Sequence, residues 1–466
     1  MQVETERLDR RTILALGAMG AAVLVIANDF TALSVALPAI ERDLDSELST
    51  VQWVINAYAL VFGVAIVTGG RLADMLGRRR VFVLGAAIFA FFSVLGGVAQ
   101  GALWLIGCRA AMGIGGALMW PAILGMTYAI LPRSKAGLAG GLILGAAGFG
   151  NAIGPLVGGL LTETLSWRWI FFLNVPIAGL AVLLTVRAVP KDATEADRGR
   201  LDYAGTAALS TGLLALLFAL DQSSSWGWGD IRTLALLAAC PLLLAIFVLI
   251  ERRAGESALI PKDVIANRAF ASACLAVLLM SAVFFASLLY LPQFMTKALH
   301  YSALGAGAGL APMMCMFAAT SFAAGPLYGR LGPKLIISAG AVFITLGILL
   351  LSRLDASNGY GALVPGMVVL GIGIGLFYSS ITTTAVTALD PSRSSLAGGI
   401  VYMFQIAGGA VGLGLNTAIV TSGTEATIDG LVNGINDAFR LDAALAALAV
   451  LVVAVRRVQP LRPTTA

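Results

Sequence analysis

Two charged residues lie well inside apolar stretches of the sequence and are the best candidates for chemistry. Asp29 is in the run 13–37 and Arg109 in the run 103–131. A charge near the middle of a membrane helix costs roughly 2.5–3.5 kcal/mol on translocon scales, so such residues usually face other helices or a wet cavity. With about 1.5 Å of rise per residue, Asp29 lies about 14 Å from Pro38 and Arg109 about 9 Å from Leu103. These depths permit an encounter, in which a water or a shift of one turn could connect the two side chains.

A carboxyl and a guanidinium at this depth allow two interpretations. An adjacent guanidinium favours the ionised carboxylate and burial favours the neutral carboxyl, so a conformational change could make Asp29 take up or release a proton. The alternative is a static ion pair that joins two helices. The single histidine, His300, and the absence of closely spaced cysteines leave no basis for a metal site or a histidine relay.

Three other acids, Glu163, Asp221 and Asp442, lie within about two turns of the ends of apolar runs, where interfacial water tolerates charge. We expect structural or interfacial roles for them and keep Glu163 and Asp221 as secondary proton-binding candidates.

The elements that position these residues are predicted membrane helices. Of 466 residues, 59% are apolar and 12% are charged, which indicates an all-α polytopic membrane protein. Fourteen runs are long enough to cross the bilayer: 13–37, 51–72, 81–100, 103–131, 137–161, 169–188, 204–222, 233–250, 270–295, 303–329, 335–352, 361–388, 395–420 and 438–455. Most of the 30 Lys and Arg residues fall on the side of the two termini, which predicts that both termini are cytoplasmic. The same distribution explains the net charge of +5 without a nucleic-acid partner.

An internal repeat predicts two related halves. The string GRLADMLGRR from Gly70 resembles GPLYGRLGPK from Gly325, and two further glycine pairs repeat at nearly the same spacing. This predicts a six-helix bundle in 1–190, a linker with two inserted helices in 191–260, and a second six-helix bundle with a short tail in 261–466. Two such halves are expected of many secondary transporters.

The string GRLADMLGRRRVF resembles the loop motif between the second and third helices of the major facilitator superfamily. Its glycines, Gly70 and Gly77, permit a tight turn, and Asp74 can pair with basic residues or meet a helix N-terminus. The basic residues Arg78 and Arg79 could alternatively serve only to orient the chain.

Further strings resemble the branch of fourteen-helix drug:proton antiporters within that superfamily. They are DFTALSVALP from Asp29, QWVINAY from Gln52 and WRWIFFLNVP from Trp167. GNAIGPLVGGLL resembles an antiporter motif and holds Gly150, Gly154, Pro155, Gly158 and Gly159, although simple close packing explains it as well. The resemblance implies that Asp29 exchanges protons or meets a cationic substrate directly. CRAAMG, which contains Arg109, is similar to a motif of the fourth helix but has Met112 where the family has glutamine.

The resemblance implies a proton-coupled exporter of amphipathic or cationic compounds that works by alternating access in the plasma membrane. It also implies that the protein is not an enzyme, uses no ATP site or other cofactor, and is a monomer. Alternatives are an exporter dedicated to one metabolite and a membrane sensor that does not transport. Candidate cavity residues, for which core packing is an equal alternative, are Trp53, Asn56, Tyr58, Trp120, Gln293 and Gln405.

Overall fold

The computed structural model describes residues 8–190, 202–355, 357–422 and 427–455, and the regular structure in these ranges is helical throughout. The long helices are α1 (Arg10–Asp43), α3 (Trp53–Leu76), α4 (Arg78–Gly97), α5 (Ala102–Ile130), α6 (Ala136–Thr164), α7 (Arg168–Ala188), α8 (Tyr203–Trp226), α9 (Ile231–Ala254), α11 (Arg268–Lys297), α13 (Ala311–Leu331), α14 (Pro333–Leu351), α15 (Leu363–Thr387), α16 (Ser394–Ser422) and α17 (Ile428–Val455). Short helices are α2 (Leu48–Val51), α10 (Lys262–Ala266) and α12 (Ala303–Gly309).

Each of the fourteen predicted apolar runs falls mainly on one of the long helices, and the run 303–329 also covers the short helix α12. Within the described residues, thirteen helical segments are long and apolar enough to cross a membrane, and α17 is a further helix of 28 residues. The predicted polytopic helical membrane fold is therefore confirmed. The prediction for the last run was too short, because α17 begins at Ile428 and carries Asp429 and Asp437 in the part that the apolar pattern left out.

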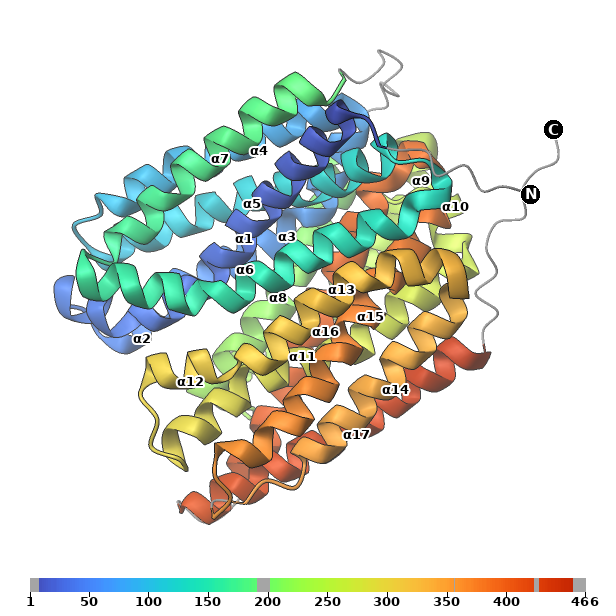
Figure 1. Cartoon of the computed structure of the whole chain (residues 1–466). Coiled ribbons are helices and arrows are strands. Elements are labelled where there is room, and N and C mark those ends of the chain that lie inside the picture. The colour runs from blue at the N-terminus through green and yellow to red at the C-terminus, as the bar shows by residue number, and fades with distance from the viewer. Residues whose placement is uncertain (1–7, 191–201, 356, 423–426, 456–466) are drawn as a thin grey trace.

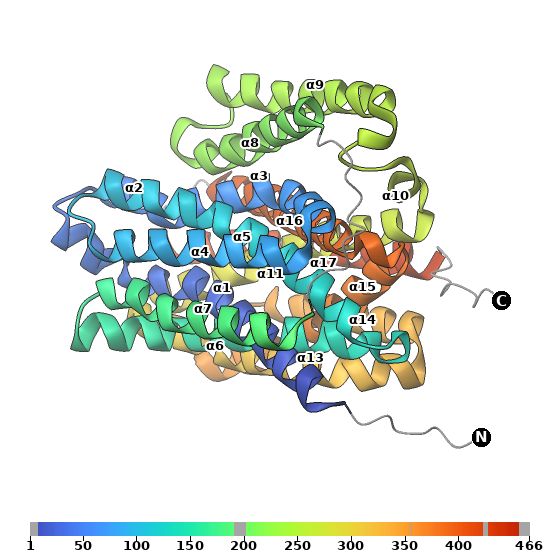
Figure 2. The same ribbon diagram turned by 90° about the horizontal axis from the view of Figure 1, so that it is seen from above.

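The helices form two groups with a layer added on one flank (Figures 1 and 2). In the first group α1 packs on α6 and α7, and α5 packs on α3 and α4; in the second α11 packs on α16 and α17, and α15 packs on α13 and α14. The groups meet where α3 contacts α16 and where α6 contacts α13. Helices α8 and α9 pack on each other along one flank, and α8 contacts α3 and α16 (Figure 2).

Glycines let α3 and α16 approach closely toward one end. A Cβ atom on Gly70 would lie 2.7 Å from the carbonyl oxygen of Ser395, and one on Gly63 would lie 3.0 Å from Cγ2 of Ile406. Gly77 then ends α3 with a φ of 103°, a conformation that side chains other than glycine rarely adopt, and this is the predicted tight turn into α4. Gly63 and Gly70 therefore permit the close crossing of the two groups, and Gly77 permits the reversal of the chain beside it.

Candidate functional site

Asp29 and Arg109 form a direct ion pair between α1 and α5. Arg109 Nη1 donates to Asp29 Oδ2, and both side chains are completely buried. Arg109 Nε also donates to the backbone carbonyl of Val54 on α3 at 2.8 Å. The depths estimated from the sequence correctly placed the two residues together, and no bridging water or helix shift is needed.

Polar residues of α4 and α7 complete the surroundings of the pair. Asn174 Nδ2 donates to Asp29 Oδ1 at 2.8 Å and lies 3.1 Å from Ser93 Oγ, which in turn donates to the carbonyl of Phe171. The sequence analysis did not single out Asn174 or Ser93, although Asn174 is an isolated amide in the apolar string WRWIFFLNVP. The carboxylate is therefore held by partners from two other helices.

The guanidinium has mainly apolar neighbours on its remaining sides. Its Cζ lies 4.3 Å from the centroid of the Tyr58 ring, which is cation–π distance. Met112, which stands where the resembling motif has glutamine, places its sulfur 4.0 Å from Arg109 Nη1, and Arg109 Nη2 has no hydrogen-bond partner among the described residues. The amide contact to the pair thus comes from Asn174 rather than from the position of Met112.

A pocket of about 1140 Å³ lies between α3, α8, α11, α16 and the start of α17. Three predicted cavity residues, Trp53, Asn56 and Gln293, line it, as does Asp221 of α8. Asn56 Nδ2 donates to Asp221 Oδ1 at 2.7 Å, so the first inserted helix supplies a carboxylate to the pocket wall. The lining residues that the sequence analysis missed include Tyr290, Thr417, Lys297 and His300. Because Lys297 and His300, at the end of α11 and just after it, are exposed, the pocket is open to solvent at that end.

The other predicted cavity residues do not line this pocket. Tyr58 faces Arg109, on the opposite side of α3 from Trp53 and Asn56. Tyr58 is five residues from Trp53 and two from Asn56, and residues at these separations point to different faces of a helix. Trp120 packs on Tyr402 with ring centroids 4.6 Å apart, and Gln405 is half-buried beside the pocket-lining Ile406.

Two of the predicted acids also lie outside the pocket wall. Asp29 is buried within the first group of helices, and Glu163 is exposed near the end of α6. In this conformation Asp221 is the predicted acid that a molecule in the pocket could contact.

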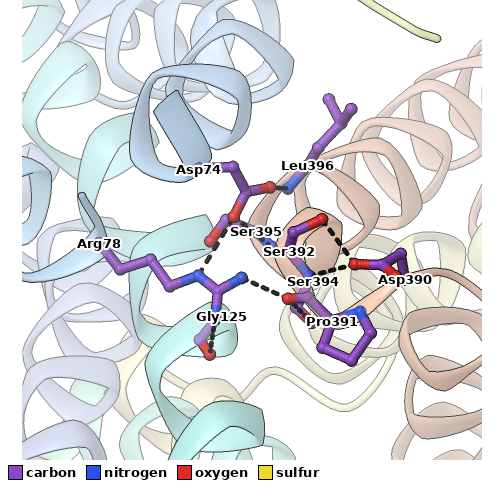
Figure 3. Close-up of polar contacts among 9 residues, drawn as sticks. All are labelled: Asp74, Arg78, Gly125, Asp390, Pro391, Ser392, Ser394, Ser395 and Leu396. Atoms are coloured by element: carbon purple, nitrogen blue, oxygen red, sulfur yellow. Dashed lines mark hydrogen bonds and ion pairs between the residues drawn. The ribbon is translucent and has the colours of Figure 1, made fainter. Parts of the chain in front are cut away.

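Asp74 and Arg78 bridge the two groups of helices at the other end of α3 (Figure 3). Asp74 accepts hydrogen bonds from the backbone N–H groups of Leu396 at 2.8 Å and Ser395 at 3.3 Å, and from Arg78 Nε at 3.2 Å. Arg78 also donates to the carbonyls of Gly125 at 3.0 Å and Pro391 at 2.5 Å. We call this set of contacts the latch.

The latch combines the two contacts that the motif made possible for Asp74. The carboxylate pairs with a basic residue and also lies at the N-terminus of α16, where unpaired backbone N–H groups favour a negative charge. Arg79 instead donates to the carbonyl of Val189 within the first group. Because the pocket lies at the N-terminal end of α3 and the latch at its C-terminal end, the two groups are separated at one end and joined at the other.

The glycine motif of α6 packs directly against the helix that carries Asp29. A Cβ atom would lie 1.9 Å from Thr31 Oγ1 if placed on Gly154 and 2.2 Å from the Ala32 carbonyl oxygen if placed on Gly158, and Gly150 faces Ala27. On a neighbouring face Gly159 approaches Leu304 of α12, and Pro155 lies 3.2 Å from the Cβ position of Gly307. This geometry fits close packing and is equally compatible with the antiporter motif.

Comparison with known proteins gives consistent matches over most of the chain. The sequence model described as Major Facilitator Superfamily matches residues 19–413 and 273–465. The chain is 35% identical over 430 residues to a puromycin resistance protein of Streptomyces alboniger, covering 89% of this chain and 85% of the relative. It is 32% identical over 449 residues to a cephamycin export protein of Amycolatopsis lactamdurans, and the match covers 95% of this chain and 90% of the relative.

Two further matches extend the comparison to another exporter and to a solved structure. A tetracenomycin C resistance and export protein of Streptomyces glaucescens is 31% identical over 407 residues, covering 87% of this chain and 75% of the relative. The crystal structure of the human organic anion transporter TETRAN superposes with a TM-score of 0.66 at 14% sequence identity, covering 95% of this chain and 99% of that one, which supports the fold.

Proposed function

Because the chain belongs to the major facilitator superfamily, we propose that it exports amphipathic or cationic compounds in exchange for protons, by alternating access. The family predicted from the sequence motifs is confirmed, and its members are transporters rather than enzymes. The protein is a multi-pass protein of the plasma membrane whose relatives include drug and antibiotic exporters. Proton coupling and the charge of the substrate are our proposals.

The observation that carries the proposal is the arrangement of pocket and latch at opposite ends of α3. A transporter that alternates between two sides needs a site that is open at one end while the other end is closed. With cytoplasmic termini, as the distribution of basic residues predicts, the pocket faces outward and the latch closes the cytoplasmic side. The state described here is then the outward-open state.

The pocket wall supports a preference for amphipathic cations. Apolar residues of α8, α11 and α16 form part of its lining, Trp53 adds an aromatic ring, and Asp221 adds a carboxylate held by Asn56. A positively charged group beside Asp221 and Trp53 would gain both an ionic and a cation–π contact.

Helix α3 gives a physical link between proton binding and the pocket. It carries Trp53 and Asn56 in the pocket wall, and between them Val54, whose carbonyl accepts from Arg109. A proton on Asp29 would remove the charge that pairs with Arg109 and leave a buried guanidinium without its counter-ion, which is costly. Protonation therefore favours a conformation in which Arg109 finds other partners, and α3 moves with it.

Transport into proteoliposomes under an imposed pH gradient tests the proposal. With puromycin as the cationic probe, we expect gradient-driven uptake that is lost in Asp29→Asn and retained in Glu163→Gln, which removes an exposed acid outside the pocket. A sensor would move neither protons nor the probe, so a protein that is folded but inactive with every compound tried would count against transport.

A dedicated exporter is the second candidate, because relatives are named for the export of single natural products, tetracenomycin C and cephamycin. Growth of an expressing strain against puromycin, ethidium and a panel of unrelated compounds separates the two. Protection against several unrelated cations favours the broad exporter, and protection against one compound favours the dedicated one.

A further inference from the structure

Asp442 is a second completely buried carboxyl group, and it differs from Asp29 in having no cationic partner among the residues that the structure describes. The sequence analysis expected it near a helix end with access to interfacial water, but α17 runs from Ile428 to Val455 and places it in mid-helix with no exposed surface. Asn416 Nδ2 of α16 donates to Asp442 Oδ2 at 2.9 Å, and Asp442 Oδ1 has no hydrogen-bond partner among the described residues.

The helices that pack against α17 bring no counter-ion to this carboxyl. On α11 the ionisable groups are Arg268 and Lys297 at its two ends, Cys274 and Tyr290; α14 has Lys334 in its first turn, and α16 has Tyr402. On α17 itself Arg440 pairs with Asp437 at 2.7 Å, and both of these side chains are exposed. None of these groups forms an ion pair with Asp442 in the part of the chain that the structure describes.

A carboxylate buried in this way is unfavourable unless it binds a proton. Moving an unpaired charge out of water costs far more than one amide hydrogen bond returns, and the usual outcome is that the group becomes neutral. A proton on Oδ1 would leave the bond from Asn416 to Oδ2 intact and would remove the charge. Asp29, by contrast, has Arg109 as its counter-ion in this state.

A short series of polar side chains connects Asp442 to the pocket. Thr417 follows Asn416 on α16, and its Oγ1 lies 2.9 Å from the Tyr290 hydroxyl on α11. Tyr290 and Thr417 both line the pocket. The residue that donates to Asp442 is therefore directly followed along α16 by a residue of the pocket wall.

We propose that Asp442 is a second proton-binding carboxyl, located in the second group of helices, which exchanges its proton with the pocket past Thr417 and Tyr290. Its meaning for transport rests on the proposed function: export would then be coupled to protons bound in both groups of helices, rather than at Asp29 alone. Proton binding itself can be measured without any substrate.

Infrared spectra of the purified full-length protein, recorded from acid to alkaline pH, test the assignment through the C=O stretch of protonated carboxyl groups. We expect a band at neutral pH that is lost in Asp442→Asn and retained in Asp29→Asn. Asp437→Asn is the matched control, because it removes an exposed carboxylate from the same helix and should leave the band unchanged. An Asp442→Asn spectrum that matches the unmodified protein across the titration would overturn the proposal.

Two further variants keep the test independent of folding and of transport. Asp442→Glu should shift the band rather than remove it, and Tyr290→Phe should slow its exchange in heavy water; a band unmoved by Asp442→Glu refutes the assignment. If the band is present but the proteoliposomes move no probe, then the proposed export function fails while the proton site stands. If transport is intact and the band is absent, then only the second proton site fails.

Discussion

The latch is open to a quantitative test, because Asp74 makes two of its three bonds across the two groups of helices and Arg78 makes the third, to Pro391. Asp74→Ala removes the bonds to the N–H groups of Leu396 and Ser395 and the pair with Arg78. Hydrogen bonds to charged groups contribute about 1.5–3 kcal/mol each. The bond to Ser395, at 3.3 Å, is long, and the pair with Arg78 lies within the first group, so we count little from either.

The expected effect is a loss of about 3 kcal/mol from the latched state, which corresponds to a shift of roughly a hundredfold in the equilibrium between conformations. Asp74→Asn keeps one acceptor oxygen and loses the charge, so we expect about half of this free energy, or roughly tenfold. Because Arg78 and Asp74 contact each other, their effects are not independent: the free-energy changes of Asp74→Ala and Arg78→Ala, summed, should exceed that of the double variant.

Distances between spin labels measure this equilibrium. Labels on Arg80→Cys and Lys334→Cys, both exposed at the latch end, report separation of the two groups once the four native cysteines are replaced. The matched control is Asp43→Ala, which removes an ion pair with Arg168 between α1 and α7 inside the first group. Equal distance distributions for Asp74→Ala and the control would refute the assigned role of the latch.

Three further variants test the pocket, the buried pair and the glycine interface. Asp221→Asn should weaken binding of a cationic probe by about 1.5–3 kcal/mol, roughly ten- to a hundredfold, in a fluorescence binding assay in which Glu163→Gln binds normally. Arg109→Ala should destabilise the purified protein by about 3–5 kcal/mol in thermal unfolding, because it leaves Asp29 buried without its cation. The double variant Asp29→Asn with Arg109→Ala should lose less stability than Arg109→Ala alone. Gly158→Leu should destabilise the protein by about 1–3 kcal/mol or more and so reduce the yield of folded protein, because even its Cβ would overlap Ala32, whereas Gly179→Leu on α7 has open space and should be tolerated.

The sequence predicted the helices and the local motifs better than the contacts between distant segments. The string from Gly70 predicted a turn at Gly77 and a charge-pairing role for Asp74, and both are present. It gave no indication that the helix N-terminus beside Asp74 belongs to Leu396, because no local pattern encodes a contact over such a separation. The position of Asp29 and Arg109 at similar depths was predictable from helix rise alone.

Other differences have identifiable physical causes. Helical periodicity separates Tyr58 from Trp53 and Asn56, but it does not tell which face meets the pocket. Asp442 was placed too near a helix end because the charges at Asp429 and Asp437 interrupt the apolar pattern that marks the start of α17. An isolated amide such as Asn174 fits interhelical packing as well as a role beside a carboxylate.

The helices α3 and α16 cross closely where Gly70 faces Ser395 and Gly399 faces Ile66, so a tilt of α3 about this crossing moves its two ends in opposite directions. From Ile66, α3 extends about 20 Å to Trp53 and about 12 Å to Asp74 at 1.5 Å per residue, so a tilt of about 10° displaces Trp53 by about 3 Å and Asp74 by about 2 Å in opposite directions. A hydrogen bond does not survive an extension of that size. The contacts of Asp74 are therefore either made or broken, and the same tilt that breaks them carries Trp53 toward the opposite wall of the pocket.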